Sequence, residues 1–167
     1  NCTSETNKLY AKVRVTNTGK FSGEEVVQVY IAKPQGKLGK PAKELAAFEK
    51  TRELQPGESQ LMILTWEIND MASYDDLGKV KKSAYVLEAG SYDIYVGTSV
   101  RDVTKADYSY ILNHDVITEQ LSAKLVPTSL PKRMLADGSY EALPQSEPVD
   151  TDYSAIGNID PSMTEGV

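Results

Sequence analysis

Close pairs of carboxylates are the first residues in this sequence whose type and spacing could support chemistry. They occur at Glu24–Glu25, Asp75–Asp76 and Asp150–Asp152. Two carboxyl groups that face each other across a glycosidic bond can hydrolyse it. Adjacent residues on a strand point to opposite faces, so the first pair cannot converge on one bond. The other two pairs lie in expected loops, where solvated acids are the ordinary interpretation.

Other catalytic and metal-binding patterns are absent from the sequence. His114 is the only histidine, and its neighbour Asp115 is accompanied by no nucleophile motif, so a hydrolytic triad is not predicted. Cys2 is the only cysteine, and it has no partner at metal-ligand spacing. Asn69–Asp70 with Asp75–Asp76 could hold a calcium ion, but a capped turn is the favoured interpretation. We therefore predict no catalytic residue, no cofactor and no metal ion.

Aromatic residues raise a different chemistry, because sugar rings stack on exposed aromatic faces. The sequence has ten tyrosines and one tryptophan. Trp66 lies in a run that is apolar on both faces, so we expect it to be buried. The candidate sugar contacts are Tyr10, Tyr74 and Tyr85, for which scattered structural tyrosines are the alternative interpretation.

Composition limits the classes of partner. Acidic residues outnumber basic residues by 24 to 18, and the net charge of −6 argues against nucleic acid as a partner. No apolar run reaches the roughly 18 residues of a membrane span. The 167 residues suffice for one domain, or for one domain with a long tail. The chain does not begin with methionine, so we expect either an excised fragment or a processed chain, and the sequence leaves its compartment open.

The elements that would position these side chains are short strands, which we expect over the first 112 residues. Alternating apolar residues predict a half-buried strand at Leu9–Val15 and another at Glu25–Ala32. Glu44–Leu54 is a third region with scattered apolar positions. Gln60–Ile68 is apolar on both faces and is therefore expected to lie deep in a sheet. The predicted fold is an all-β, immunoglobulin-like antiparallel sandwich of about seven strands.

Turn residues separate these strands and suggest structural roles. Gly57 follows a proline, in the order that a tight turn prefers. Gly90 lies in Glu88–Ser91, which we expect to be a hairpin corner between flanking strands. Tyr92 begins the next strand, where sandwiches of this class place a tyrosine whose hydroxyl bonds to upstream backbone. Structural roles are predicted for Gly57, Gly90, Tyr92 and Trp66.

The sequence changes character after about residue 113, where prolines recur among acidic and small polar residues. We divide the chain into a sandwich at residues 1–114 and an extended, proline-containing tail or linker at residues 115–167. Scattered apolar residues along the tail suit a segment that packs on a neighbouring domain.

Four segments in order resemble the fibronectin type III-like domain of glycoside hydrolase family 3, the β-glucosidase and β-xylosidase type enzymes. They are Val15–Lys20 running into Gly23–Tyr30, Pro41–Phe48, Leu54–Ser59, and Leu87–Gly97 followed by Ser99–Asp102. The resemblance covers roughly residues 8–112.

The resemblance implies a scaffolding role. In that family the catalytic groups lie in other domains, so none can be carried over to this chain. It implies packing against the catalytic barrel and α/β domains of the same polypeptide. The loops Pro34–Pro41 and Met71–Lys82 are the long ones, so we expect them to make such contacts and one of them to reach a β-linked oligosaccharide at the active-site rim. The tail would connect to a following barrel in a member of permuted domain order. An autonomous carbohydrate-binding module and a surface adhesion domain are the alternative functions.

Overall fold

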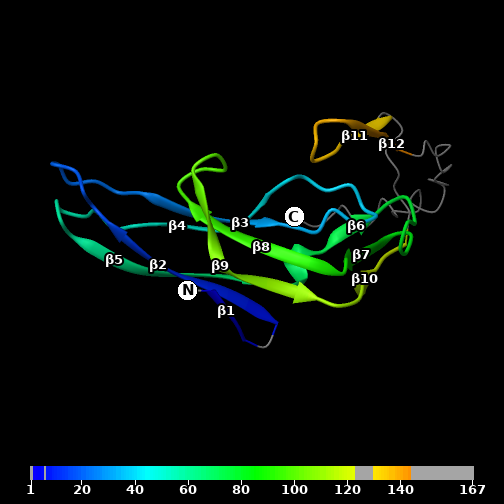
Figure 1. Ribbon diagram of the computed structural model, residues 1–167, viewed down its shortest axis with the longest axis horizontal. Coiled ribbons are helices and arrows are strands. Elements are labelled where there is room, and N and C mark those ends of the chain that lie inside the picture. Colours follow the sequence, from blue (N-terminus) through cyan, green and yellow to red (C-terminus); the bar gives the residue numbers. More distant parts are fainter. Residues whose placement is uncertain (1, 6, 123–129, 144–167) are drawn as a thin grey trace, which may run out of the picture.

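A computed structural model describes residues 2–5, 7–122 and 130–143 (Figure 1). The elements in this part of the chain are β1 (Cys2–Glu5), β2 (Lys8–Thr16), β3 (Val26–Ala32), β4 (Glu44–Lys50), β5 (Ser59–Glu67), the 3-10 turn η1 (Asn69–Met71), β6 (Ser73–Asp75), β7 (Ala84–Leu87), β8 (Gly90–Gly97), β9 (Val103–Leu112), β10 (Val116–Gln120), β11 (Lys132–Met134) and β12 (Tyr140–Ala142). No helix among the described residues is long and apolar enough to cross a membrane.

Two antiparallel sheets form the body of the molecule, and their strand orders are β1-β2-β5 and β4-β3-β8-β9. The alternation in β2 places Leu9 and Ala11 in the core and Tyr10 on the outer face. Val29 and Ile31 of β3 face the same core from the other sheet. The predicted all-β, immunoglobulin-like sandwich is confirmed, and period-two patterning is the reason why its two inner faces are apolar.

The expectation that the strand at Gln60–Ile68 lies deep in a sheet is wrong. The strand is β5, which stands at the edge of its sheet and pairs only with β2 within the described residues. Its inner residues are buried, but Leu61 and Ile63 on the other face are 59% and 54% exposed. Apolar residues on both faces therefore mark a surface that nothing in the described part of the chain covers.

The expected hairpin corner at Glu88–Ser91 is also wrong as a hairpin. β7 pairs with β6 and β10, whereas β8 pairs with β3 and β9, so the corner carries the chain from one sheet to another. Gly90 has φ 139°, and a Cβ there would lie 2.6 Å from the Cβ of Pro34. A glycine is favoured both in a tight hairpin turn and where two segments approach closely, so its presence at this corner could not distinguish the two structures.

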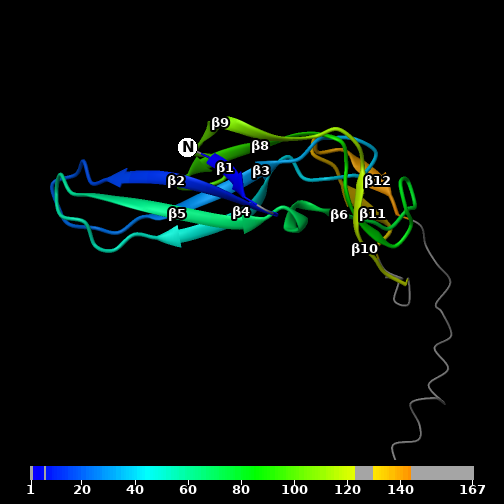
Figure 2. The same ribbon diagram turned by 90° about the horizontal axis from the view of Figure 1, so that it is seen from below.

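A third sheet, β10-β7-β6, and the hairpin β11-β12 lie together at one end of the molecule (Figures 1 and 2). Strand pairing thus continues past residue 114, although the division of the chain into a sandwich and a tail stays a prediction. The described parts of the expected tail contain β10, β11 and β12. Residues 123–129 and 144–167 lie outside the described residues.

Candidate functional site

The end of the molecule with the third sheet also holds the two long loops, and a buried ion pair shapes the first of them. Glu88 and Lys40 are 3% and 2% exposed, and the Lys40 ammonium donates to the Glu88 carboxylate. The same carboxylate accepts the backbone N–H groups of Lys37 at 2.5 Å and Leu38 at 3.1 Å. Lys40 also donates to the carbonyl oxygen of Pro34 at 2.6 Å. The β3–β4 loop is therefore wrapped around Glu88.

The backbone of Glu88 takes part in a second buried contact. The Tyr92 hydroxyl donates to the Glu88 carbonyl oxygen at 2.9 Å, and Tyr92 is 1% exposed. Its ring meets the edge of the Tyr110 ring at a centroid distance of 6.1 Å. Burial, together with the nearby charge of Glu88, raises the pKa of Tyr92, so the hydroxyl remains a donor. Glu88 therefore joins the corner between the sheets, through its carbonyl oxygen, to the β3–β4 loop, through its carboxylate.

Asp75 organises the second long loop, between β6 and β7. Its side chain is buried, and its two oxygens accept four backbone N–H groups at 2.7–3.0 Å. Burial acts to raise the pKa of Asp75, but the four bonds outweigh it and hold that pKa below its ordinary value. The interpretation of Asp75 as a solvated acid is therefore wrong, and the capped turn is what the structure shows.

The other candidate acids are engaged separately. Glu24 pairs with Lys50, and the carboxylate of Glu25 accepts its neighbour's backbone N–H at 2.9 Å. Asp115 accepts the N–H of Ala89 at 2.8 Å, while His114 is exposed. Asp150 and Asp152 lie outside the described residues. Within the described ranges, no three His, Cys, Asp or Glu side chains gather into a group that could hold a metal ion.

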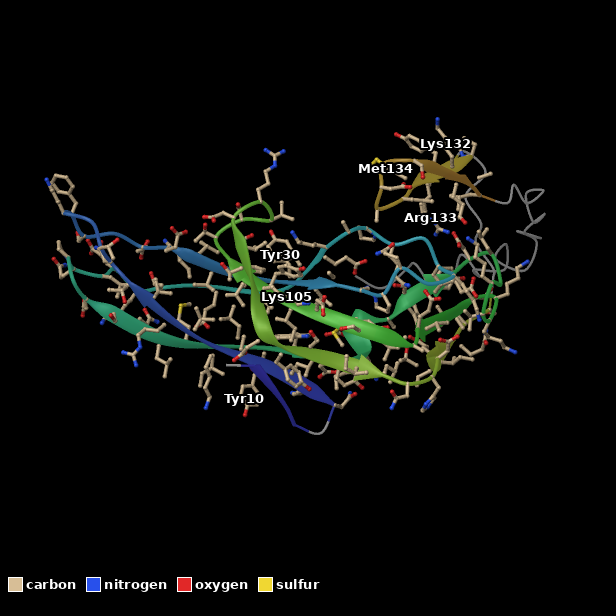
Figure 3. All side chains as sticks on the ribbon, in the orientation of Figure 1. Tyr10, Tyr30, Lys105, Lys132, Arg133 and Met134 are labelled. Atoms are coloured by element: carbon tan, nitrogen blue, oxygen red, sulfur yellow. The ribbon has the colours of Figure 1, made fainter. Side chains whose placement is uncertain are left out.

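The hairpin β11-β12 packs across both long loops. Arg133 donates to Asp76 at 3.2 and 3.3 Å and to Glu141 at 2.8 Å, and Lys79 also pairs with Glu141. Figure 3 shows Arg133 on the side of the hairpin that faces the loops and Lys132 on the opposite side. A Cβ on Gly39 would lie 2.7 Å from the Leu135 side chain, so the hairpin lies directly against the β3–β4 loop.

The three candidate sugar-contacting tyrosines fall on two sheets. Tyr74 and Tyr85 are cross-strand neighbours on β6 and β7, with ring centroids 5.4 Å apart and exposed fractions of 37% and 38%. Tyr10 projects from β2 in the β1-β2-β5 sheet, as Figure 3 shows. The structure therefore brings two of the three together. Trp66 is 4% exposed and contributes to the core.

An exposed face that the sequence did not predict lies on the four-stranded sheet. Phe48 and Leu45 of β4 are 68% and 50% exposed. Their partners in register, Gln28 and Tyr30, alternate with buried residues along β3 and so lie on its outer face, and Tyr30 can be followed in Figure 3. A bulge between Val29 and Tyr30 shifts the register, so apolar residues three apart in β4 share one face. The spacing of three between Leu45 and Phe48 was the sequence signal from which this exposed face could have been predicted.

Comparisons with known proteins identify the class of domain. Residues 25–100 match the family described as fibronectin type III-like domain. The chain is 64% identical over 148 residues to β-glucosidase A of Butyrivibrio fibrisolvens, which covers 89% of this chain and 18% of that protein. It is 43% identical to a β-glucosidase of Ruminococcus albus, covering 80% of this chain and 14% of that protein.

Comparison with solved structures also identifies β-glucosidases as similar proteins. A β-glucosidase from Paenibacillus barengoltzii superposes with a TM-score of 0.75 at 42% identity, covering 88% of this chain and 18% of that one. β-Glucosidase 3B from Thermotoga neapolitana, solved with α-D-glucose, gives a TM-score of 0.63 at 37% identity, covering 71% of this chain and 16% of that one. The chain thus spans less than a fifth of each of these relatives.

The sandwich and the matched residues define a fibronectin type III-like domain. More particularly, the chain belongs with the fibronectin type III-like domains found in β-glucosidases of glycoside hydrolase family 3.

Proposed function

We propose that this chain is a non-catalytic accessory domain of a family 3 β-glucosidase-like enzyme. The observation that carries the proposal is the coverage of the relatives. The chain aligns over 89% of its own length with a β-glucosidase of which it represents only 18%. In such an enzyme, hydrolysis of the glycosidic bond belongs to the remaining four-fifths of the polypeptide.

Two outer sheet faces suit a bracing role. Phe48 and Leu45 are exposed on the four-stranded sheet, and Leu61 and Ile63 are exposed on the three-stranded sheet. Large apolar side chains on the surface of a soluble domain mark contacts with another protein surface. The partners that fit are the catalytic barrel and α/β domains of the same polypeptide, which would remove these side chains from water.

The long loops suit a place at the rim of the active site. Glu88 and Asp75 fix the loop backbones through buried bonds, so each loop is held in one shape before any partner binds. A preorganised loop loses little conformational entropy when it meets a partner or a substrate. Contact with a β-linked oligosaccharide at that rim would therefore need no rearrangement of either loop.

An autonomous carbohydrate-binding module is the alternative function. The exposed pair Tyr74–Tyr85 favours it, because paired aromatic rings can hold consecutive sugar units. The position of Tyr10 on another sheet works against a continuous row of three. An accessory domain can also bind sugar, so sugar binding alone does not separate the two functions. The alternative differs in claiming that the module acts independently, without a parent enzyme.

The purified chain, freed of contaminating glycosidases, tests the absence of catalysis. We expect no turnover of 4-nitrophenyl β-glucoside or 4-nitrophenyl β-xyloside above the buffer blank at any pH between 4 and 9. The control is the Butyrivibrio β-glucosidase A at equal molar concentration, which should release nitrophenol. Saturable turnover that co-purifies with the chain and disappears on its unfolding would overturn the proposal.

A further inference from the structure

We propose that the outer face of the β6-β7-β10 sheet is a binding site for soluble β-linked gluco-oligosaccharides. Only the choice of sugar rests on the proposed function, because a β-glucosidase acts on β-linked glucose. The existence of the site rests on the geometry of this face. The site lies outside the ion pairs and turns that hold the long loops.

The strand register builds the face. Tyr74 of β6 pairs with Tyr85 of β7, and Tyr85 pairs with Glu119 of β10, so three side chains stand in one row across the sheet. The flanking residues Ala84 and Val86 point the other way and are buried. The row therefore faces away from the core on a surface that the described residues leave open.

The support beneath this row is rigid. Ala84 and Val86 pack against Leu38 of the β3–β4 loop and Val80 of the β6–β7 loop in a small separate core. Both loops are in turn fixed by the buried carboxylates of Glu88 and Asp75. A site whose supporting side chains are locked by packing loses less entropy when a ligand binds.

A shallow concavity of about 410 Å³ lies beside Tyr85, and this volume would hold one or two sugar units. Its lining residues are Asn69, Asp70, Ala72, Tyr85, Thr118 and Glu119. An aromatic wall with a few converging polar groups is the usual composition of a small-molecule site. The bulge between Ile117 and Glu119 opens the strand at this point and turns Thr118 toward the concavity.

The carboxylates at this concavity are available. Among the described residues, those of Asp70 and Glu119 make no hydrogen bond or ion pair, whereas those of Asp75, Glu88 and Glu141 accept backbone or side-chain N–H groups. Free carboxylates accept hydrogen bonds from the hydroxyl groups of a sugar, and charge assistance strengthens those bonds. Two negative charges disfavour anionic ligands, whereas a neutral polyol can donate its hydroxyl groups to both carboxylates.

The ring geometry narrows the ligand further. The planes of Tyr74 and Tyr85 are tilted by 56° to each other. A flat crystalline cellulose surface needs coplanar rings, whereas a free oligosaccharide can turn each unit to meet its own ring. We therefore assign the site to soluble chains and exclude crystalline cellulose as its ligand.

Calorimetric and NMR titrations of the full 167-residue chain test the site. The probes are cellotetraose and laminaritetraose, with maltotetraose as the α-linked control. We expect saturable binding of at least one β-linked probe, with amide shifts that centre on residues 69–74, 85 and 117–119. Binding of maltotetraose with equal affinity would overturn the assignment to β-linked chains, and no binding of either β-linked probe at millimolar concentration would overturn the site.

Matched variants locate the binding. Tyr85→Ala should weaken binding by about tenfold or more, because a few aromatic contacts dominate small interfaces. Glu119→Ala changes an exposed residue of an edge strand, so it tests the site without endangering the fold. Tyr10→Ala, on the other sheet, should leave the affinity unchanged. Equal affinities for all three variants would contradict the location. Turnover of chromogenic glucoside is measured separately, so failure of this site leaves the accessory role standing.

Discussion

The Tyr92 hydroxyl donates to the carbonyl oxygen of Glu88 at 2.9 Å, four residues upstream, where the chain crosses from one sheet to the next. The carboxylate of the same Glu88 holds the β3–β4 loop through Lys40 and two backbone N–H groups. The corner and the loop are therefore fixed by one residue, and substitutions on either side of it should have separable effects.

Tyr92→Phe removes the corner hydrogen bond while it keeps the buried ring. We expect a loss of about 1–3 kcal/mol in the free energy of unfolding, because the Glu88 carbonyl loses a buried donor. Urea denaturation with tyrosine and tryptophan fluorescence measures it. Tyr110→Phe is the matched control, since the Tyr110 ring touches Tyr92 but its hydroxyl makes no bond recorded in the described residues. Equal losses in the two variants would contradict the assigned hydrogen bond.

Lys40→Met breaks the buried ion pair and leaves the Glu88 carboxylate without its cation. We expect a loss of about 3–5 kcal/mol, because an uncompensated buried charge is costly. Lys37→Met in the same loop is the control. The Lys37–Asp115 pair is 3.7 Å long with side chains 62% and 31% exposed, so its removal should cost less than about 1 kcal/mol. Similar losses for both lysines would show that burial does not set the strength of this pair.

Asp75 should make stability depend on pH in acid. Its pKa in the folded state lies below the ordinary 3.8, since four N–H bonds outweigh the opposing effect of burial. Because the pKa of Asp75 is lower in the folded state than in the unfolded state, the ionised carboxylate stabilises the fold at any pH above the unfolded-state pKa. This contribution is lost as the pH falls through the folded-state pKa. We expect the contribution to be complete above about pH 5 and to decline below about pH 4.

Asp75→Asn tests this origin of the acid sensitivity. An amide offers one acceptor oxygen to four donors, so we expect a loss of at least about 2 kcal/mol at pH 7. Urea unfolding at several pH values between 3 and 7 should then show a smaller stability difference between the variant and the native chain at the acid end. A difference that stays constant across this range would contradict a titrating role for Asp75.

The two structural glycines should differ in their tolerance of alanine. Gly57 has φ 81° with no atom within 4 Å of an added Cβ, so Gly57→Ala should cost only the backbone strain of about 1–2 kcal/mol. Gly90 has φ 139° and an added Cβ would lie 2.6 Å from Pro34, so overpacking adds about 1–3 kcal/mol. Thermal denaturation of both variants measures the difference. A larger loss at Gly57 would refute the close approach at Gly90.

Sequence patterns predicted the inner faces of the sandwich well. Alternation at Leu9–Val15 gave β2, and the apolar positions of Glu25–Ala32 gave β3, because period two is a local property of a strand. The position of Tyr92 after a glycine corner indicated its buried hydrogen bond. These features depend on residues close together in the chain, so the sequence records them directly.

Features that depend on distant residues could not be predicted in the same way. Leu61 and Ile63 are apolar yet exposed. The apolar character of a strand face does not tell whether another part of the same chain covers that face, so their exposure could not be predicted. Lys40 and Glu88 are 48 residues apart, and nothing in either local sequence marks them as partners. The pairing of Tyr74 with Tyr85 likewise follows from the register of β6 and β7, and the sequence alone left Tyr10 equally eligible.

The most direct test of the accessory role uses Butyrivibrio β-glucosidase A, whose 148 matched residues can be deleted or replaced by the matching part of this chain. The measurement is turnover of 4-nitrophenyl β-glucoside after heating to a series of temperatures. We predict that the replacement enzyme keeps activity and resistance to heating near those of the native enzyme, while the deletion loses both. A deletion variant as active and as heat-resistant as the native enzyme would contradict the proposed function.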